Sequence, residues 1–352
     1  MVTIIGGGPI GCYTASLLAK NHEVSLYEEN EEVGIPIQCT GILSETIHEL
    51  LPLKKEFVAN KVRSARIFAP NKKNICIELK KPNVIVYRNK FDQHFRDRAI
   101  NNGAEIFYSH RFIEKNKVKD LKNKKQKKIK YDTLIGADGP LSKVSKKYGL
   151  GKRSYLQGVQ ALIKKKNDNA VDFYPYIGTY AWAVPQSEDV LRVGVAAPKN
   201  AMKIFKEFSK KYKGKNLGWQ GGLIPIHDPK IQAQKDNVFL VGDAAAQIKN
   251  TTGGGLIPGL MCAEELSKAI SENKDYDKLW RKRVGRKLWT HYFARKVMNR
   301  FEEKDWNEMV NMFTSKRMRT VLSTESRDEP VKVITKALLR NPKLLLFLRK
   351  LF

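Results

Sequence analysis

A glycine-rich segment near the start of the chain, Gly6-Gly7-Gly8-Pro9-Ile10-Gly11, constrains the fold more than any other feature. It follows an apolar run from Val2 to Ile5 and precedes a helical pattern over residues 10–19. Between a strand and a helix, Gly6 permits a tight turn, Gly8 lets the main chain approach a pyrophosphate, and Gly11 lets helix and strand pack closely. The phosphates then face the positive end of the helix. The sequence therefore predicts a dinucleotide-binding β-α-β unit.

Glu28 follows the second expected strand, residues 23–27. An acidic residue about 20 positions past the glycines can accept hydrogen bonds from a ribose 2′-hydroxyl, and it repels a 2′-phosphate. The alternative interpretation is a solvated carboxylate at a strand end, and the neighbouring Glu29 is the residue most easily confused with it. Glu28 is the predicted ribose ligand.

Length and residue usage limit the possible classes of protein. A chain of 352 residues buries about three quarters of its unfolded surface, enough for one large or two coupled domains. The four cysteines form no C-x-x-C pair and the six histidines show no metal-binding spacing, so we expect no disulfide framework, no metal site and a reducing, cytoplasmic setting. His227 is expected to be a loop residue. The sequence contains no uninterrupted apolar stretch of about 18 residues, so it predicts no membrane span.

The formal net charge of +29 is unusually high, and lysine runs at 122–128 and 164–166 contribute to it. Such a surface attracts an anionic membrane, an acidic redox partner or nucleic acid. The simpler interpretation is a set of solvated, lysine-rich loops. Nucleic acid is disfavoured because the lysines are not interleaved with aromatic residues.

A second glycine cluster, Gly253-Gly254-Gly255, follows Val241-Gly242-Asp243-Ala244, and the pair of clusters favours a flavin over a nicotinamide. The expected fold class is α/β, with strands over residues 131–137 and 159–197 and helices over 90–101 and beyond 259. Residues 1–63, 84–158 and 232–275 are predicted to form a discontinuous, Rossmann-like cofactor domain. Residues 64–83 and 159–231 form a β-rich substrate domain, and residues 276–352 a helical C-terminal region.

Three segments in order carry a family resemblance: Gly6–Gly11 with Glu28, the run Gly136-Ala137-Asp138-Gly139-Pro140-Leu141-Ser142, and Gly242-Asp243 with the later glycines. Together they resemble the signatures of the p-hydroxybenzoate-hydroxylase-type FAD fold. Within that group, Val33–Gly41 and Tyr180–Pro185 are similar to the geranylgeranyl reductase family, particularly archaeal reductases of digeranylgeranylglycerophospholipids. The family pattern Y-x-W-x-F-P-K has Val184 in place of Phe and Gln186 in place of Lys here.

The resemblance implies a bound FAD. Asp243 would bond its ribityl chain, Arg88 would approach it, and Phe112 would contact adenine through its backbone. Helix-terminal N–H groups at Gly254 would stabilise the negative charge of reduced flavin. The alternative interpretations are a purely structural turn for Gly242-Asp243, a surface position for Arg88 and core packing for Phe112. The implied cofactor residues are Gly6, Gly8, Pro9, Ile10, Gly11, Glu28, Cys39, Thr40, Gly41, Arg88, Phe112, Asp138, Asp243, Gly254, Gly255 and Leu256.

The resemblance also implies a substrate site. Cys39 would line the flavin and the alkene and is the catalytic candidate, although a loop cysteine can equally be a small buried hydrophobe. Tyr180 and Trp182 alternate with alanines, so both lie on one face of a strand that ends at Pro185. These three residues are the predicted substrate contacts; the alternative is an aromatic stripe in the core.

The implied activity is FAD-dependent saturation of the isolated double bonds of geranylgeranyl lipids, with electrons from NAD(P)H or a ferredoxin-like donor. Residues 331–352 combine leucines with lysines and arginines, which suggests attachment to the inner face of a membrane; the alternative is helices packed on the protein. Two other functions stay open: an FAD-dependent aromatic monooxygenase or halogenase of the same fold, and a basic peripheral membrane or nucleic-acid-binding protein.

Overall fold

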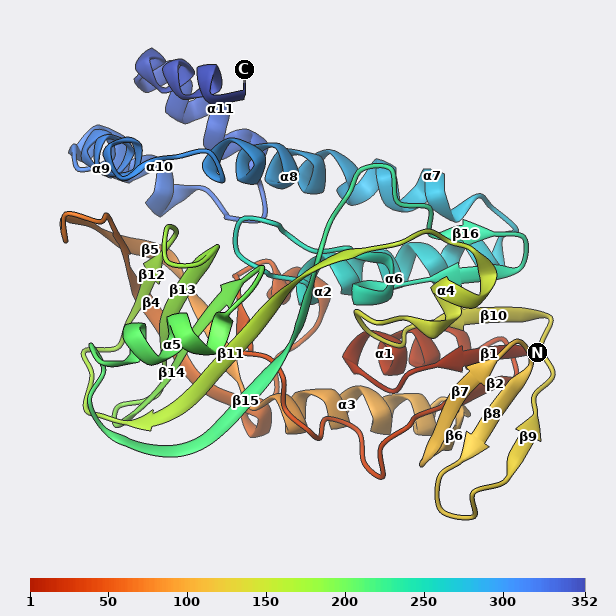
Figure 1. Ribbon diagram of the computed structural model, residues 1–352. Helices are drawn as coiled ribbons and strands as arrows, with labels where there is room; N and C mark the ends of the chain where they lie inside the picture. The colour runs from red at the N-terminus through yellow and green to blue at the C-terminus, as the bar shows by residue number, and fades with distance from the viewer. Residues whose placement is uncertain (352) are drawn as a thin grey trace.

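Three β-sheets organise residues 1–351, the part of the chain that the computed structural model describes (Figure 1). A six-stranded sheet lies at one end of the molecule and an eight-stranded sheet at the other, while a three-stranded sheet accompanies the first. The C-terminal helices run past both large sheets. The predicted α/β class, with a Rossmann-like unit, a second sheet and a helical C-terminal region, is confirmed.

The six-stranded sheet has the order β16 (Gln234–Lys235), β17 (Val238–Leu240), β10 (Thr133–Gly136), β1 (Val2–Ile5), β2 (Val24–Tyr27) and β6 (Glu105–Phe107). From β17 to β6 every neighbouring pair is parallel, and β16 adds an antiparallel edge. All four residues of β1 are buried. Parallel strands read as short apolar runs because both faces of the sheet are covered.

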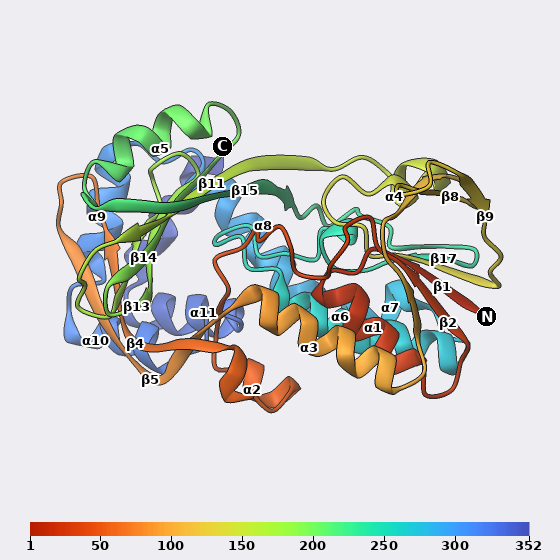
Figure 2. The ribbon, with the colours of Figure 1, turned by 90° about the horizontal axis from the view of Figure 1, so that it is seen from below.

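Different layers cover the two faces (Figure 2). On one face α1 (Pro9–Leu18) packs against both α3 (Arg88–Asn101) and α6 (Leu256–Ser271). On the other lie α4 (Lys143–Tyr148) and the three-stranded sheet of β7 (His110–Glu114), β8 (Lys117–Asp120) and β9 (Gln126–Lys128). One hydrophobic core contains residues from both layers.

Ile10 packs against two glycines that flank the second glycine cluster, one before it and one after it. A Cβ atom at Gly259 in α6 would lie 2.9 Å from Ile10 Cδ1, and one at Gly242 would lie 3.2 Å from Ile10 Cβ. Because neither glycine has a side chain, α1 and α6 approach each other around this isoleucine. The N-terminal segment that contains α1 and the later segment that contains α6 therefore form one unit.

The eight-stranded sheet is largely antiparallel and carries α5 (Ala201–Ser209) on its outer face. It extends beyond the predicted substrate domain, because residues 42–43, 58–63, 84–86 and 154–158, which the sequence placed in the cofactor domain, also pair in it. Its order is β15 (Lys215–Ile226), β11 (Ser154–Lys164), β14 (Val190–Ala197), β13 (Tyr180–Ser187), β12 (Ala170–Tyr174), β4 (Val58–Phe68), β5 (Asn74–Val86) and β3 (Ile42–Leu43).

The C-terminal region begins as one helical run, in which α7 (Tyr276–Trp280) and α8 (Arg286–Met298) are joined by the π-helical segment η3 (Arg281–Gly285). Its later helices pack on β5, where Val310 meets Ile75 and Ile77. The remaining elements are α2 (Ile47–Leu50), η1 (Lys55–Phe57), η2 (Gly242–Ala245), α9 (Glu303–Met312), α10 (Lys316–Thr324), α11 (Pro330–Arg340) and η4 (Pro342–Leu351).

Within residues 1–351, no helix has the length and apolar character needed to cross a bilayer. The same residues contain no cluster of histidine, cysteine or acidic side chains arranged to hold a metal ion.

Candidate cofactor and substrate site

Four predicted site segments meet at one edge of the six-stranded sheet. The Gly6 turn follows β1, Glu28 follows β2, Asp138 lies two residues past β10, and Asp243 lies three residues past β17. The four strands are neighbours and parallel, so their carboxyl ends share an edge. Ligands of open α/β sheets bind at that edge.

The first glycine turn is built from close backbone contacts. Gly6 has φ of +104°, and a Cβ atom there would lie 2.4 Å from the carbonyl oxygen of Ala137. A Cβ atom at Gly11 would lie 2.0 Å from the carbonyl oxygen of Gly6. By contrast, a Cβ atom at Gly8 would meet nothing within 4 Å. Pro9 begins α1 at its first position, where its missing N–H costs no hydrogen bond.

Glu28 is buried beneath this turn. Its Oε2 accepts a 2.6 Å hydrogen bond from the Gly7 N–H, and its Oε1 accepts from the backbone and side-chain N–H groups of Asn30, both at 2.8 Å. Burial raises the pKa of Glu28, and the hydrogen bonds oppose that shift. A carboxylate has about four acceptor positions. Glu28 therefore orders the glycine turn and keeps capacity for a hydroxyl donor.

Asp138 holds α4 with one carboxylate oxygen. Oδ2 accepts from the N–H groups of Lys143 at 2.7 Å and Val144 at 3.1 Å, whereas Oδ1 is buried without a hydrogen-bond partner among the described residues. Burial raises the pKa of this carboxyl group. Buried polar atoms are nearly always paired, so an orphaned acceptor beside the glycine turn fits a ligand that brings a hydroxyl or N–H group.

Asp243 faces the start of α6, whose first residue is Leu256. A Cβ atom at Gly255 would lie 2.9 Å from Asp243 Oδ1, so this close approach requires glycine. Removal from water raises the pKa of Asp243 to about 6, while the charge of Arg88 acts in the opposite direction. A half-buried carboxylate lies here beside the positive end of a 16-residue helix.

Cys39 lies in a loop between two guanidinium groups, and its thiol accepts a 3.4 Å hydrogen bond from the Gly41 N–H. Arg88 is held by both oxygens of Asp92, at 3.0 and 2.9 Å. Arg192 donates to the Thr40 carbonyl and is 2% exposed. Burial lowers the pKa of Arg192 to about 10. Arg192 also donates to Gln186 Oε1 at 2.8 Å and to the Cys39 carbonyl at 3.4 Å, and it thereby fixes the Cys39 loop against the eight-stranded sheet.

The aromatic pair on β13 faces this loop. Thr40 Oγ1 donates to Gln160 Oε1 at 2.8 Å, and Trp182 Nε1 donates to the same oxygen at 3.3 Å. The rings of Tyr180 and Trp182 are 6.0 Å apart, on the face of β13 opposite α5. A Cβ atom at Gly194 would lie 2.3 Å from the indole, so glycine there lets the ring lie flat. The tertiary structure thus joins the Cys39 loop to the aromatic strand.

Two predicted residues lie apart from this group. Pro185 is at the far end of β13, where its carbonyl accepts from Asn60. Phe112 lies on β7 with its side chain in the main core, as its apolar character predicts. The β7 strand begins beside the cofactor edge, because the His110 N–H donates to the Glu28 carbonyl at 2.7 Å. The predicted adenine contact of Phe112 remains a prediction.

Sequence reasoning missed Gln160 and Arg192, which join the two halves of the site. Both are polar side chains in strands that are otherwise largely apolar, and that interruption was the available signal. It also missed Lys249, whose side chain passes under Gly254 and forms a buried ion pair with Asp328. Their separation of 79 residues gives no local pattern.

His227 is a loop residue, as predicted, but it is 1% exposed. Its Nδ1–H donates to the Ala246 carbonyl at 2.9 Å, and its backbone pairs with the side chain of Asn250. Burial lowers the pKa of His227 to about 4. The neutral histidine therefore supports, through these hydrogen bonds, the backbone that leads into the second glycine cluster.

Comparison with known proteins agrees with the Rossmann-like unit and the overall fold. Residues 4–42 match the model of an NAD(P)-binding Rossmann-like domain. The chain is 29% identical to digeranylgeranylglycerophospholipid reductase 3 of Methanosphaera stadtmanae, over 99% of this chain and 98% of that protein. It is 30% identical to an uncharacterized protein of Methanocaldococcus jannaschii, over 84% of this chain and 83% of that protein.

Solved structures show the same fold. A geranylgeranyl bacteriochlorophyll reductase-like protein of Thermoplasma acidophilum superposes with a TM-score of 0.84 at 22% identity, covering 100% of this chain and 98% of that chain. The flavin-dependent halogenase CmlS gives a TM-score of 0.67 at 15% identity, covering 98% of this chain and 77% of that chain. At these identities the structural likeness demonstrates the fold alone.

Proposed function

The chain belongs to the geranylgeranyl reductase family, and from this premise we propose that it is an FAD-dependent reductase that saturates the double bonds of geranylgeranyl chains in membrane lipids. The observation that carries the proposal is the hydrogen-bonded chain from Thr40 through Gln160 to Trp182. It joins a cysteine loop at the cofactor edge to an aromatic wall on the second sheet.

FAD suits the donor and acceptor groups at the sheet edge. Gly6 and Gly11 permit the close backbone contacts that build the turn, and Gly8 leaves main chain open to a pyrophosphate. Glu28 offers acceptor capacity to a ribose hydroxyl. Asp138 Oδ1 supplies a further acceptor that has no partner of its own. Asp243 and the start of α6 would receive the ribityl chain and the flavin ring. The bound cofactor would supply the hydride for the reduction.

The protein's own residues would orient the alkene and exclude water. An isolated double bond has no carbonyl group to hold charge, so protonation must accompany hydride addition and competing water must be kept out. Trp182 is fixed through Gln160, and Tyr180 is almost fully buried beside it. The rings of Tyr180 and Trp182 would contact an isoprenoid chain and position it next to the Cys39 loop. Arg192 holds that loop in place through the Thr40 carbonyl.

Cys39 is the proposed catalytic residue, and it would lie beside the reacting double bond. Cys39→Ala and Cys39→Ser variants test this role: both should keep FAD, while the rate of lipid reduction falls at least tenfold in the alanine variant. Retention of wild-type rates by Cys39→Ala would assign the cysteine a packing role.

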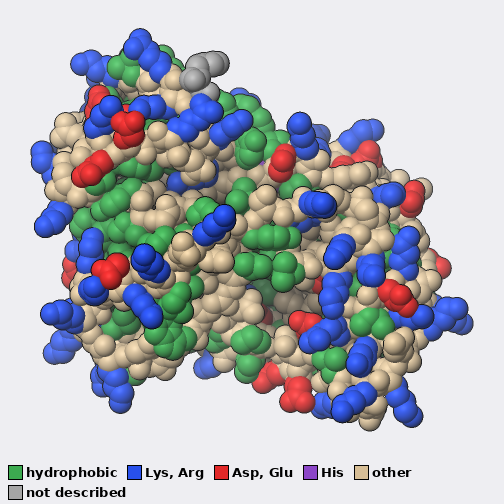
Figure 3. Space-filling view, in the orientation of Figure 1, with side chains coloured by type: hydrophobic (Ala, Val, Ile, Leu, Met, Phe, Trp, Pro, Cys, Tyr) green, Lys and Arg blue, Asp and Glu red, His purple; other side chains and the backbone are tan. Residues whose placement is uncertain are grey.

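The C-terminal segment supports attachment to an anionic bilayer. Figure 3 shows hydrophobic side chains beside lysines and arginines over the C-terminal helices at the upper left. Leu339 is 75% exposed, and Leu345 and Leu346 are also exposed, near Arg340 and Lys343. Phe347 instead packs on Phe301, with ring centroids 5.0 Å apart. One side of the segment thus packs on the protein, and we propose that the other contacts lipid headgroups, where each cation contributes about 1 kcal/mol.

Purified protein should retain FAD and, after anaerobic reduction, transfer hydrogen to digeranylgeranylglyceryl phospholipid in vesicles. Each saturated bond adds one hydride and one proton, so the lipid mass rises by two hydrogens per bond while flavin absorbance returns. An unchanged double-bond count would refute the proposal. NAD(P)H and reduced ferredoxin, supplied separately, would identify the electron donor. Oxygen-dependent NAD(P)H consumption stimulated by a small aromatic compound would favour a monooxygenase or halogenase instead.

A further inference from the structure

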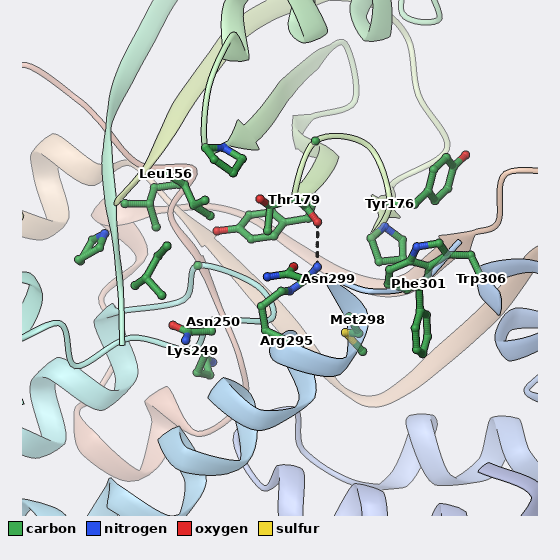
Figure 4. A pocket seen from close by; sticks show the side chains of 18 residues that line it. Leu156, Tyr176, Thr179, Lys249, Asn250, Arg295, Met298, Asn299, Phe301 and Trp306 are labelled. Atoms are coloured by element: carbon green, nitrogen blue, oxygen red, sulfur yellow. Dashed lines mark hydrogen bonds between the residues drawn. The ribbon is translucent and has the colours of Figure 1, made fainter. Parts of the chain in front are cut away.

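A cavity of about 400 Å³ lies where α8, the start of β13 and the second glycine cluster meet (Figure 4). Aromatic and sulfur-containing side chains occupy one end, including Met298, Phe301 and Trp306. The described residues that line it include two cations, Lys249 and Arg295, and no carboxylate. The cavity therefore combines an apolar end with positive charge.

The two cations differ in how they are compensated. Lys249 forms a buried ion pair with Asp328. Arg295 is 6% exposed, and within residues 1–351 its hydrogen bonds go only to main-chain carbonyls, to Thr179 at 3.1 Å and Thr251 at 3.3 Å. Its Nε atom has no partner among the described residues. Burial lowers the pKa of Arg295 to about 10, so the group stays charged near neutral pH.

A second unpartnered donor lies beside this guanidinium. The Arg295 Cζ atom is 5.8 Å from the centre of the Tyr180 ring, and the Tyr180 hydroxyl is buried without a hydrogen bond in the described structure. Figure 4 shows Arg295 rising from α8 toward Thr179, the residue before Tyr180. A buried cation that lacks a counter-charge is costly, and so is an unsatisfied buried hydroxyl. An anionic oxygen ligand relieves both.

We propose that this cavity binds the phosphate end of the lipid substrate, with the Arg295 guanidinium as the ionic partner and the Tyr180 hydroxyl as a second donor. The assignment deepens the proposed function and rests on it. A guanidinium suits phosphate because its N–H groups match two phosphate oxygens at once. Tyr180 also adjoins Trp182, so a chain anchored at Arg295 leads along the aromatic wall toward the Cys39 loop.

Equilibrium binding tests the headgroup site without requiring turnover. Isothermal titration calorimetry of the FAD-loaded protein should give tighter binding of geranylgeranyl phosphate than of uncharged geranylgeraniol. Arg295→Gln should weaken geranylgeranyl phosphate about ten- to a hundredfold and change geranylgeraniol less than about twofold. Arg295→Lys, which keeps the charge, should recover part of the loss. Tyr180→Phe should weaken the phosphate probe by a smaller factor. Lys296→Gln removes an exposed charge from the same helix and should leave both affinities unchanged.

Equal wild-type affinity for the two probes would overturn the inference, and so would equal losses of both in Arg295→Gln. If Arg295→Gln fails to fold, the inference is judged on Arg295→Lys and Tyr180→Phe. Inorganic phosphate that competes as effectively as geranylgeranyl phosphate would identify a free-phosphate site and refute a lipid headgroup site. Charge-dependent binding without lipid reduction would support the phosphate subsite and refute the reductase function. Lipid reduction together with an unchanged affinity of Arg295→Gln for geranylgeranyl phosphate would support the reductase function and refute the subsite.

Discussion

The ion pair between Lys249 and Asp328 connects the second glycine cluster to the C-terminal region, and replacing Asp328 with Asn should destabilise both. The two side chains are 7% and 6% exposed, and the Ser44 hydroxyl also donates to Asp328. Burial alone would raise the pKa of Asp328, but the charges of Lys249 and Arg327 hold it well below its usual range. The substitution leaves a buried ammonium group without its counter-charge.

The expected cost is about 3–5 kcal/mol, the penalty for removing one partner of a buried pair. For a chain of 352 residues this corresponds to a fall in Tm of about 4–7 °C. Since Lys249 closes the loop that presents Gly254 to α6, the variant should also release FAD more readily. The contribution of ionised Asp328 to the free energy of unfolding is fully present above the carboxyl pKa of the unfolded chain. It is lost as the pH falls through the lower pKa that Asp328 has in the folded protein.

Thermal and urea unfolding of Asp328→Asn, together with the fraction of FAD retained after gel filtration, measure these effects. Glu207→Gln is the matched control, because the Glu207–Lys210 pair is 70% and 69% exposed and should change stability by less than about 1 kcal/mol. A double variant, Lys249→Met with Asp328→Leu, should recover much of the lost stability, because the Lys249 ammonium group is then no longer buried without its counter-charge. Equal losses in Asp328→Asn and Glu207→Gln would refute the reasoning.

Three further predictions follow from other contacts. The folded pKa of His227, about 4, lies below its ordinary value, so stability should fall by about 3 kcal/mol as the pH drops from 6.5 to 4, and His227→Gln should flatten that part of a pH series of urea titrations. Gly194→Ala would place Cβ 2.3 Å from the Trp182 ring; it should raise KM for the lipid while bound FAD is unchanged, and a normal KM would show that the indole does not position substrate. Gly11→Ala would place Cβ 2.0 Å from the Gly6 carbonyl oxygen and should yield protein without flavin absorbance, whereas a full complement of FAD would contradict the proposed turn.

Local sequence patterns determined the elements of the cofactor edge. The Gly6 turn lies between an apolar strand and a helix, and Glu28 and Asp138 each follow a strand that the sequence predicted. Such patterns are readable because a tight turn, a buried parallel strand and a helix start each require particular residue types within a few positions. The alternation that put Tyr180 and Trp182 on one face of β13 is of the same kind.

Only the tertiary structure decided which of these elements meet. Gln160 connects Thr40 to Trp182 across 120 and 22 residues, Arg192 holds the Cys39 loop from a distant strand, and Asp328 neutralises Lys249 from the C-terminal region. The chain folds these groups together through the packing of two sheets and a helical region, and no short-range spacing encodes such contacts. The charge balance of a buried arginine such as Arg295 depends in the same way on every neighbour around it. The sequence supplied the arginine, and the fold places no carboxylate of the described residues beside it.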